Sequence, residues 1–360
     1  MEELIEIAKK RLKEKNIYGD IYIENIIKTE IIVNESAVEK ITKSDTINGN
    51  VRVIKNGKMG FCYFSGKEKN IIDESISKAI NSTFIEGYEK YLFNNINIAR
   101  QPETFDNSYK NINDETKINM TLLLEKSVKE NPLIKSVRDT NYTDTLEKTY
   151  YVNSENLQVY NEKTKFFIYT SAVAEKNSNR EMAECFEFTS LLKEIDIEKL
   201  GKDCAKKAIN LLNTKKIKSG KYKILLPSEI ACDLVSLLSK MFLGDNIVKG
   251  KSLLSSYKPG DKIASDILTI KDDALLNYKI GSFSIDGEGV IGKNKYVIEN
   301  GILKSFLFDK KSAYLYNTDS TGNCIRTNFK LLPECGVSNF YIINGNDSIE
   351  NIIKNFTVIH

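Results

Sequence analysis

The sequence predicts an α+β protein whose N-terminal helices pack on antiparallel sheets and whose C-terminal domain is β-rich, either barrel-like or a sandwich. Two observations predict this class. Up to residue 214, segments with apolar residues at helical spacing alternate with β-like runs. After Gly260, short β-like segments are separated by turns roughly every ten residues, which is typical of a barrel or a sandwich.

Residues 1–100 are expected to form a first α+β domain. An N-terminal helix is indicated by Leu4, Ala8 and Leu12, which share one helical face. Asn56-Gly57 is typical of the tight turn of a β-hairpin. The expected elements are a helix at 1–16, a β-like run at 28–42, a turn at 45–50, a hairpin at 49–61 and a helix at 71–88.

A middle α+β region, 114–214, is expected to pack with the first domain. A basic stretch, 215–221, separates it from a C-terminal domain, 220–360. Pro227-Ser228-Glu229 is a typical helix start. The expected elements are a polar loop at 94–113, helices at 116–130, 200–212 and 227–243, and strands at 134–142, 146–152, 166–174, 181–190 and 222–226.

The composition argues against several classes of protein. The 52 basic and 49 acidic residues give a net charge of +3, too small an excess for nucleic-acid binding by phosphate neutralisation. No apolar run approaches the roughly 18 residues of a membrane span. The N-terminus carries acidic residues at once, unlike a signal peptide, so a cytoplasmic protein is expected. Six scattered cysteines without a CxxC pair predict buried free thiols in a reducing compartment.

The scarcity of histidine limits the chemistry of the chain. Its one histidine is His360, the last residue, where chain order is usually poor. Nucleophilic catalysis by a Ser/His/Asp or Cys/His arrangement needs an imidazole held in a structured site. Zinc hydrolases likewise draw on histidine ligands. We therefore expect neither a catalytic histidine nor a bound cofactor in this chain.

Acidic and glycine-rich turns supply the remaining candidate sites. Asp272-Asp273 could join a hard-cation site, although a turn or helix cap is favoured for this pair. Asp286 and Glu288 would face the same side of an extended loop and could act as paired carboxylates. Flanking glycines favour a plain turn there instead. The turn 320–323 could expose backbone N–H groups to a peptide or an anion, but is also most often only a turn.

Several segments in a fixed order carry a family resemblance. They are GNVRVIKNGKMGF at 49–61, LLPSEIA at 225–231, GDNIVKGKS at 244–252, GDKIASD at 260–266, the pair 272–273, DGEGV at 286–290, IENGILK at 298–304 and STGN at 320–323. Together they resemble the TldD/PmbA family, also called modulators of DNA gyrase. The match extends over nearly the whole chain.

The family that this chain resembles has two branches. TldD-like members carry an HExxxH zinc motif on the first helix of the C-terminal domain. Counted back from Gly244-Asp245, the matching positions here hold Val235, Ser236 and Lys240, none of which can bind the metal or act as the base. The chain is therefore similar to the metal-free PmbA (TldE) branch.

Membership of that branch implies a non-catalytic subunit. It would pair with a zinc-bearing TldD-like paralogue in a protease for unfolded polypeptides or peptide precursors, active in peptide maturation and antitoxin turnover. An isolated chain could form a homodimer. The candidate residues for contact with an extended polypeptide are Asp286, Glu288, Gly289, Thr321, Gly322 and Asn323. Family members continue for several dozen residues beyond the point where this chain stops, so a truncated C-terminal domain is expected.

Two functions of other classes stay open at this stage. One is a stand-alone hydrolase that uses Asp286 and Glu288, directly or through a hard metal ion. The other is an interaction protein that binds gyrase. Activity of the isolated chain that a chelator abolishes would favour the metal hydrolase, whereas co-purification with gyrase and no peptidase would favour the interaction protein.

Overall fold

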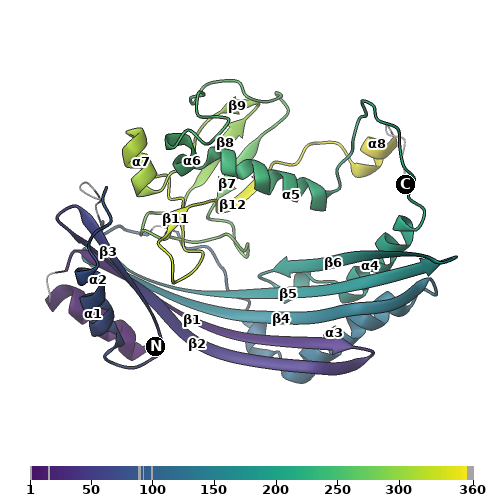
Figure 1. The fold of residues 1–360 in the computed structure, drawn as a ribbon, viewed down its shortest axis with the longest axis horizontal. Helices are drawn as coiled ribbons and strands as arrows, with labels where there is room; N and C mark the ends of the chain where they lie inside the picture. The colour runs from purple at the N-terminus through teal and green to yellow at the C-terminus, as the bar shows by residue number, and fades with distance from the viewer. Residues whose placement is uncertain (1, 15–16, 88–90, 92, 99, 355–360) are drawn as a thin grey trace.

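A computed structural model describes residues 2–14, 17–87, 91, 93–98 and 100–354. One antiparallel sheet dominates it, with the strand order β3-β2-β1-β4-β5-β6. Its strands are β1 (Gly19–Asn34), β2 (Ala37–Lys55), β3 (Lys58–Ser65), β4 (Ile134–Asn153), β5 (Gln158–Lys176) and β6 (Asn179–Thr189). The sheet is curved like half of a barrel, with helices on its convex side and the C-terminal part over its concave side (Figure 1). The α+β class and the helices on an antiparallel sheet are thus confirmed.

Four helices cover the convex face. They are α1 (Glu2–Glu14), α2 (Ile71–Asn81), α3 (Asp114–Lys129) and α4 (Ile197–Leu211). Successive side chains of a strand point to opposite faces, so the odd-numbered apolar residues of β1 all face these helices. Ile21 and Ile23 pack with α1 and α2 at one end of the sheet, and Ile31 and Val33 pack with α3 and α4 at the other. One sheet therefore carries two cores.

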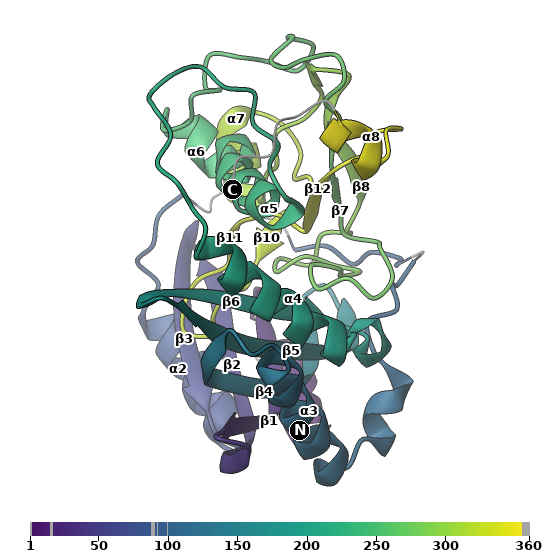
Figure 2. The ribbon, with the colours of Figure 1, turned by 90° about the vertical axis from the view of Figure 1, so that its right-hand side faces the viewer.

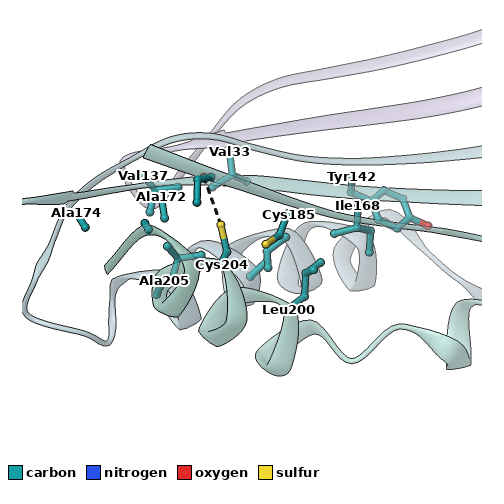
Figure 3. Packing of buried hydrophobic residues seen from close by; sticks show 14 of the residues in the cluster. Val33, Val137, Tyr142, Ile168, Ala172, Ala174, Cys185, Leu200, Cys204 and Ala205 are labelled. Atoms are coloured by element: carbon teal, nitrogen blue, oxygen red, sulfur yellow. Dashed lines mark hydrogen bonds between the residues drawn. The ribbon is translucent and has the colours of Figure 1, made fainter. Parts of the chain in front are cut away.

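The core between α4 and the sheet contains two of the cysteines (Figure 3). Cys204 of α4 is fully buried and donates a hydrogen bond from Sγ to the Ala183 carbonyl, 3.6 Å away. All six cysteines are free. Cys185, Cys204, Cys324 and Cys335 are buried as expected, whereas Cys62 is half-buried and Cys232 is exposed.

The C-terminal part carries its short strands in two small sheets. One has the order β12-β7-β8-β9 and the other pairs β10 with β11. The strands are β7 (Ile270–Asp273), β8 (Asn294–Glu299), β9 (Ile302–Leu303), β10 (Cys324–Ile325), β11 (Glu334–Cys335) and β12 (Asn339–Ile342), and the helices are α5 (Ser228–Ser239), α6 (Gly244–Val248), α7 (Lys310–Tyr316) and α8 (Ile349–Lys354). Seen from the side, these elements lie across the sheet from α3 (Figure 2).

Several sequence-based expectations for the strands were wrong. The turn between β1 and β2 falls at Glu35-Ser36, where φ is +49° and +64°, and the stretch 45–50 lies inside β2. Glu35-Ser36 lacks the Asn-Gly signal of such turns, while the polar residues of 45–50 resemble a turn because they lie on a strand with a polar face. The expected strands 134–142 and 146–152 are one strand, β4, and 222–226 forms no strand.

Other expectations for individual elements are confirmed. Asn56-Gly57 joins β2 to β3, with φ of +52° and +72°, as a type I′ turn requires. Helix α2 starts at the expected residue but ends at Asn81, before the expected 88. Among the described residues, no helix is long and apolar enough to cross a membrane.

Gly60 gives a test of how α2 packs on β3. A Cβ atom at Gly60 would lie 1.8 Å from the backbone oxygen of Ala79 in α2, so the helix would have to move. We expect Gly60→Ala to lower the free energy of unfolding by about 1–3 kcal/mol, measured by urea denaturation. Gly345→Ala is the control, because a Cβ there meets nothing within 4 Å. Equal stability of the two variants would contradict this packing.

Candidate functional site

The glycine-flanked acidic loop of the C-terminal part, residues 285–291, packs against the concave face of the large sheet. An isolated bridge between Ile285 and Ile291 closes the loop. Inside it, Asp286 is 4% exposed, and its Oδ1 accepts hydrogen bonds from the backbone N–H groups of Glu288 and Val290, both at 2.9 Å. Its Oδ2 accepts a third from Cys324 N at 3.0 Å. Both oxygens of Asp286 thus organise the loop itself.

Beneath the loop lies a buried network of ion pairs. Arg52 of β2 stands opposite Asp20 of β1 and pairs with it, both side chains being at most 1% exposed. Arg52 Nη1 also reaches Glu288 Oε1 at 3.5 Å. From the C-terminal part, Arg326 Nη2 approaches Asp20 Oδ2 at 3.2 Å, and its Nε donates to the Gly287 carbonyl at 2.9 Å. The network therefore joins the sheet to the loop with charges contributed by both.

The pKa values of the two aspartates, Asp20 and Asp286, are shifted in opposite directions. Burial alone would raise the pKa of Asp20, but Arg52 and Arg326 outweigh it and lower the pKa. Burial and the neighbouring Glu288 raise the pKa of Asp286 to about 7, against the effect of its three backbone hydrogen bonds. Asp20 is therefore a permanent anion at neutral pH, whereas Asp286 lies near its titration midpoint.

A second cluster surrounds the turn 320–323. Thr321 Oγ1 accepts from Phe308 N at 2.7 Å and donates to Asn323 Oδ1 at 2.7 Å. Asn323 is fully buried, and its Nδ2 donates to Asp272 Oδ2 at 2.8 Å. Asp272 also pairs with Lys295 at 3.2 Å. The next residue, Asp273, caps a turn by accepting from Leu275 N at 2.8 Å, as the sequence favoured.

The six candidate contact residues are thus largely internal. Gly289 packs against the sheet, since a Cβ there would lie 2.9 Å from the ring of Tyr151, and Gly322 has a φ of +74°, which favours glycine. Of the six, Asp286 lines an open space beside the loop. The substrate-contact role assigned to them from the sequence stays a prediction.

That open space is a cleft of about 270 Å³ between the concave face and the C-terminal part. Its floor is formed by side chains of β1, β4 and β5, and its walls by the segments 280–287 and 324–326. The floor contributes Tyr22, Glu147, Thr149, Tyr151, Val159, Asn161, Lys163 and Lys165. The cleft thus brings polar groups from two parts of the chain together at one place.

One group of side chains has the atoms to bind a metal ion. Ligand atoms of Glu288, Asp309 and Cys324 lie within 4.8 Å of one another, and all three residues are buried. Their oxygens already have other partners: Glu288 Oε2 accepts from Lys310 N at 2.9 Å, and Asp309 Oδ1 accepts from Ser312 N at 2.7 Å. This cluster therefore fits a charge network better than a metal centre.

The three positions that the sequence matches to an HExxxH motif lie on α5 and at its end. Val235 and Ser236 lie on α5, and Lys240 follows its last residue. None of the three side chains offers an imidazole, carboxylate or thiolate, so they do not fit a zinc ion. His360 lies outside the described residues.

Sequence reasoning missed most charged residues of the site, among them Asp20, Arg52, Lys163 and Arg326. Arg52 alternates with the apolar residues Val51 and Val53, a pattern that does place it on the opposite face of the strand. Its partner could not be found in this way, because the pairing of Arg52 with Asp20 depends on strand register. The contacts of Arg326 with the sheet depend on how the C-terminal part packs on the concave face, which the local sequence does not encode.

The geometry first defines a class of protein: an α+β protein with a half-barrel sheet, whose concave face is capped by a C-terminal part through buried ion pairs. Comparison with family models then identifies the family. The PmbA/TldA metallopeptidase domain 1 matches residues 19–83, the central domain 107–212 and the C-terminal domain 219–359. The chain belongs to the TldD/PmbA family of metallopeptidases.

Individual relatives agree with this assignment. The chain is 30% identical to a metalloprotease PmbA homolog of Buchnera aphidicola, over 98% of this chain and 78% of the relative. It is 27% identical to a metalloprotease TldD homolog of the same organism, over 94% and 72%. A candidate modulator of a DNA gyrase from Thermotoga maritima shares the fold with a TM-score of 0.88 at 24% identity, over 97% of this chain and 80% of that one. TldE from Thermococcus kodakarensis also shares the fold, with a TM-score of 0.82 at 23% identity, over 99% and 80%.

The raised pKa of Asp286 predicts a pH dependence of stability. Its pKa in the folded chain, about 7, lies above the ordinary 3.8, so the folded state holds a proton that the unfolded state releases between these values. The stability contributed by this proton is complete below about pH 4 and is lost as the pH rises through 7. The stability of the wild type relative to Asp286→Asn should therefore fall from pH 4 to 7 and stay level above.

Chemical denaturation at a series of pH values measures this difference. The exposed Asp266, which pairs with Lys262 at the surface, supplies the control variant Asp266→Asn, an acid-to-amide change outside the buried network. A stability difference between wild type and Asp286→Asn that stays constant from pH 4 to 7 would contradict the electrostatic account of the loop.

Proposed function

We propose that this chain is the metal-free, PmbA-like subunit of a two-subunit protease, and that it helps to hold an extended polypeptide for a zinc-bearing TldD-like paralogue. The observation that carries the proposal is the identity of three residues on α5 and directly after it. Counted back from Gly244-Asp245, the positions of the zinc motif hold Val235, Ser236 and Lys240, none of which can bind zinc or act as the base that activates water. Cleavage would then depend on the partner.

The shape of the sheet supports an assembly of two such chains. The half-barrel is open, and β3 and β6 are its edge strands. A second chain of the same fold could close the half-barrel into a chamber. Unpaired edges are also the places where an extended polypeptide can add as a further strand. Backbone hydrogen bonds would then carry the affinity, so we expect binding to depend little on the side chains of the polypeptide.

Edge strand β6 is suited to such contact. Its concave-face residues Met182, Phe186 and Phe188 are exposed apolar side chains. Phe167 of the neighbouring strand packs against both phenylalanines, with ring centroids 5.9 and 6.2 Å apart. Although β6 also carries four charged residues, a cluster of exposed apolar side chains favours a surface that is covered in the working assembly.

A stand-alone hydrolase built on the acidic loop receives less support. The carboxylates of Asp286 and Glu288 accept hydrogen bonds from the chain itself, and Glu288 also pairs with Arg52. A general base needs a free lone pair within reach of its substrate. The proposal therefore gives both carboxylates a structural role.

Hydrolysis of an unfolded polypeptide tests the proposal. We expect no cleavage by this chain alone, and cleavage when it is mixed with the HExxxH-bearing paralogue of the same source, at a rate above that of the paralogue alone. A paralogue whose motif glutamate is changed to glutamine is the control and should abolish cleavage in the mixture. Cleavage by the purified chain alone, with contaminating proteases excluded, would overturn the proposal. Co-purification with gyrase without proteolysis by the mixture would favour the interaction protein.

A further inference from the structure

Lys163 of β5 points from the floor of the cleft toward the C-terminal part. Its Nζ donates hydrogen bonds to the carbonyl groups of Ile280 and Ser282, each at 2.9 Å. An ammonium group has three N–H donors, so these two bonds leave one donor for a further acceptor. The side chain lines the cleft together with both segments of the C-terminal part that form its walls.

Lys163 stands outside the ion pair on the floor of the cleft. Lys163 and Lys165 lie on the same face of β5, and Glu147 stands opposite Lys163 on β4. Glu147 forms its ion pair with Lys165, at 2.5 Å. In the described part of the chain, no carboxylate lies within ion-pair distance of Lys163. A second carboxylate, Glu24 of β1, interacts electrostatically with Lys165 and with Glu147. The direct ion pair on the floor therefore belongs to Lys165.

The charged groups in the walls of the cleft are engaged with partners other than Lys163. Arg326 is already paired with Asp20 at 3.2 Å, and both oxygens of Asp286 accept backbone hydrogen bonds. Burial lowers the pKa of Lys163 to about 8, although Glu147 opposes the effect. A half-buried cation without its own counter-ion is costly, and an anion that enters the cleft would offset this cost.

The size and lining of the cleft limit what the anion can be. Its volume of about 270 Å³ lies below the range of roughly 300–1,000 Å³ usual for small-molecule sites. Apolar side chains such as Phe283, Ile285 and Ile325 form part of its walls. A single amino-acid residue with a carboxylate and an aliphatic body matches a cleft in which Lys163 has no ion pair and part of the walls is apolar.

We propose that the cleft binds one carboxylate group of the polypeptide substrate, with Lys163 as its counter-ion and the apolar walls around the residue that carries it. This inference rests on the proposed function, because it assumes a polypeptide on the concave face. The carboxylate can be the C-terminus of the polypeptide or the side chain of an aspartate or glutamate. Both present the same two oxygens to Lys163.

Fluorescence anisotropy with the full chain and labelled peptides tests the inference. The probes are short unstructured peptides of Gly, Ser and Leu in four forms: with a free C-terminal carboxylate, with a C-terminal amide, amidated with one aspartate, and amidated with asparagine in its place. We expect a carboxylate-bearing form to bind at least about tenfold more tightly than its neutral match, as a charge-assisted hydrogen bond predicts. The form that gains affinity identifies the source of the carboxylate.

Variants at Lys163 link this difference to the cleft. Lys163→Gln removes the charge but keeps N–H donors for the backbone carbonyl groups of the cleft wall. It should therefore abolish the tighter binding of carboxylate-bearing peptides. Binding of the amidated peptide without aspartate should stay unchanged. Lys163→Arg should retain the preference. Lys148→Gln is the matched control, because Lys148 of β4 lies outside the cleft and pairs with Glu162 at 3.5 Å.

The outcomes separate the two proposals. Equal binding of all four peptides, or a preference that survives in Lys163→Gln, would overturn the carboxylate site and leave the polypeptide-holding function standing. Binding of none of the peptides, with a folded chain, would count against both. A loss of binding of the amidated peptide in Lys163→Gln would show that Lys163 only holds the wall in place, and would also overturn the inference.

Discussion

The buried pairing of Arg52 with Asp20 is the constraint on which the rest of the site depends. Buried charges are tolerated only when they are paired and hydrogen-bonded. This pair lies on the concave face of the sheet, where the C-terminal part supplies its remaining partners, Glu288 and Arg326. Removal of the C-terminal part would leave two charges of the sheet incompletely satisfied. The electrostatics of the sheet therefore hold the acidic loop in one position.

A loop held in this way acts as scaffold for the cleft. Because the carboxylates of Asp286 and Glu288 are engaged internally, the groups free to meet a ligand are those of the floor, above all Lys163. The cleft and the exposed edge β6 both belong to the concave side of the sheet. Both features support the proposal that the chain holds a polypeptide.

The sequence predicted the class of fold and many elements, but few contacts of the site. Helical periodicity and the Asn56-Gly57 turn are local signals, and the structure confirms α3, α4 and the β2–β3 hairpin. The Glu35-Ser36 turn carries no such signal and was missed. The acidic loop was found because its glycines and carboxylates stand together in the chain. Asp20 and Arg52 are 32 residues apart and meet only through strand register, and no pattern along one chain encodes that pairing.

A double-mutant cycle between Arg52 and Glu288 tests the central claim most directly. These residues come from the sheet and from the C-terminal part, and their side chains meet at 3.5 Å in a buried environment. The free energies of unfolding of Arg52→Met, Glu288→Gln and the double variant should reveal a coupling of about 1 kcal/mol or more, as for other close buried charge pairs. Strictly additive effects would mean that the two parts are held together by something other than this network.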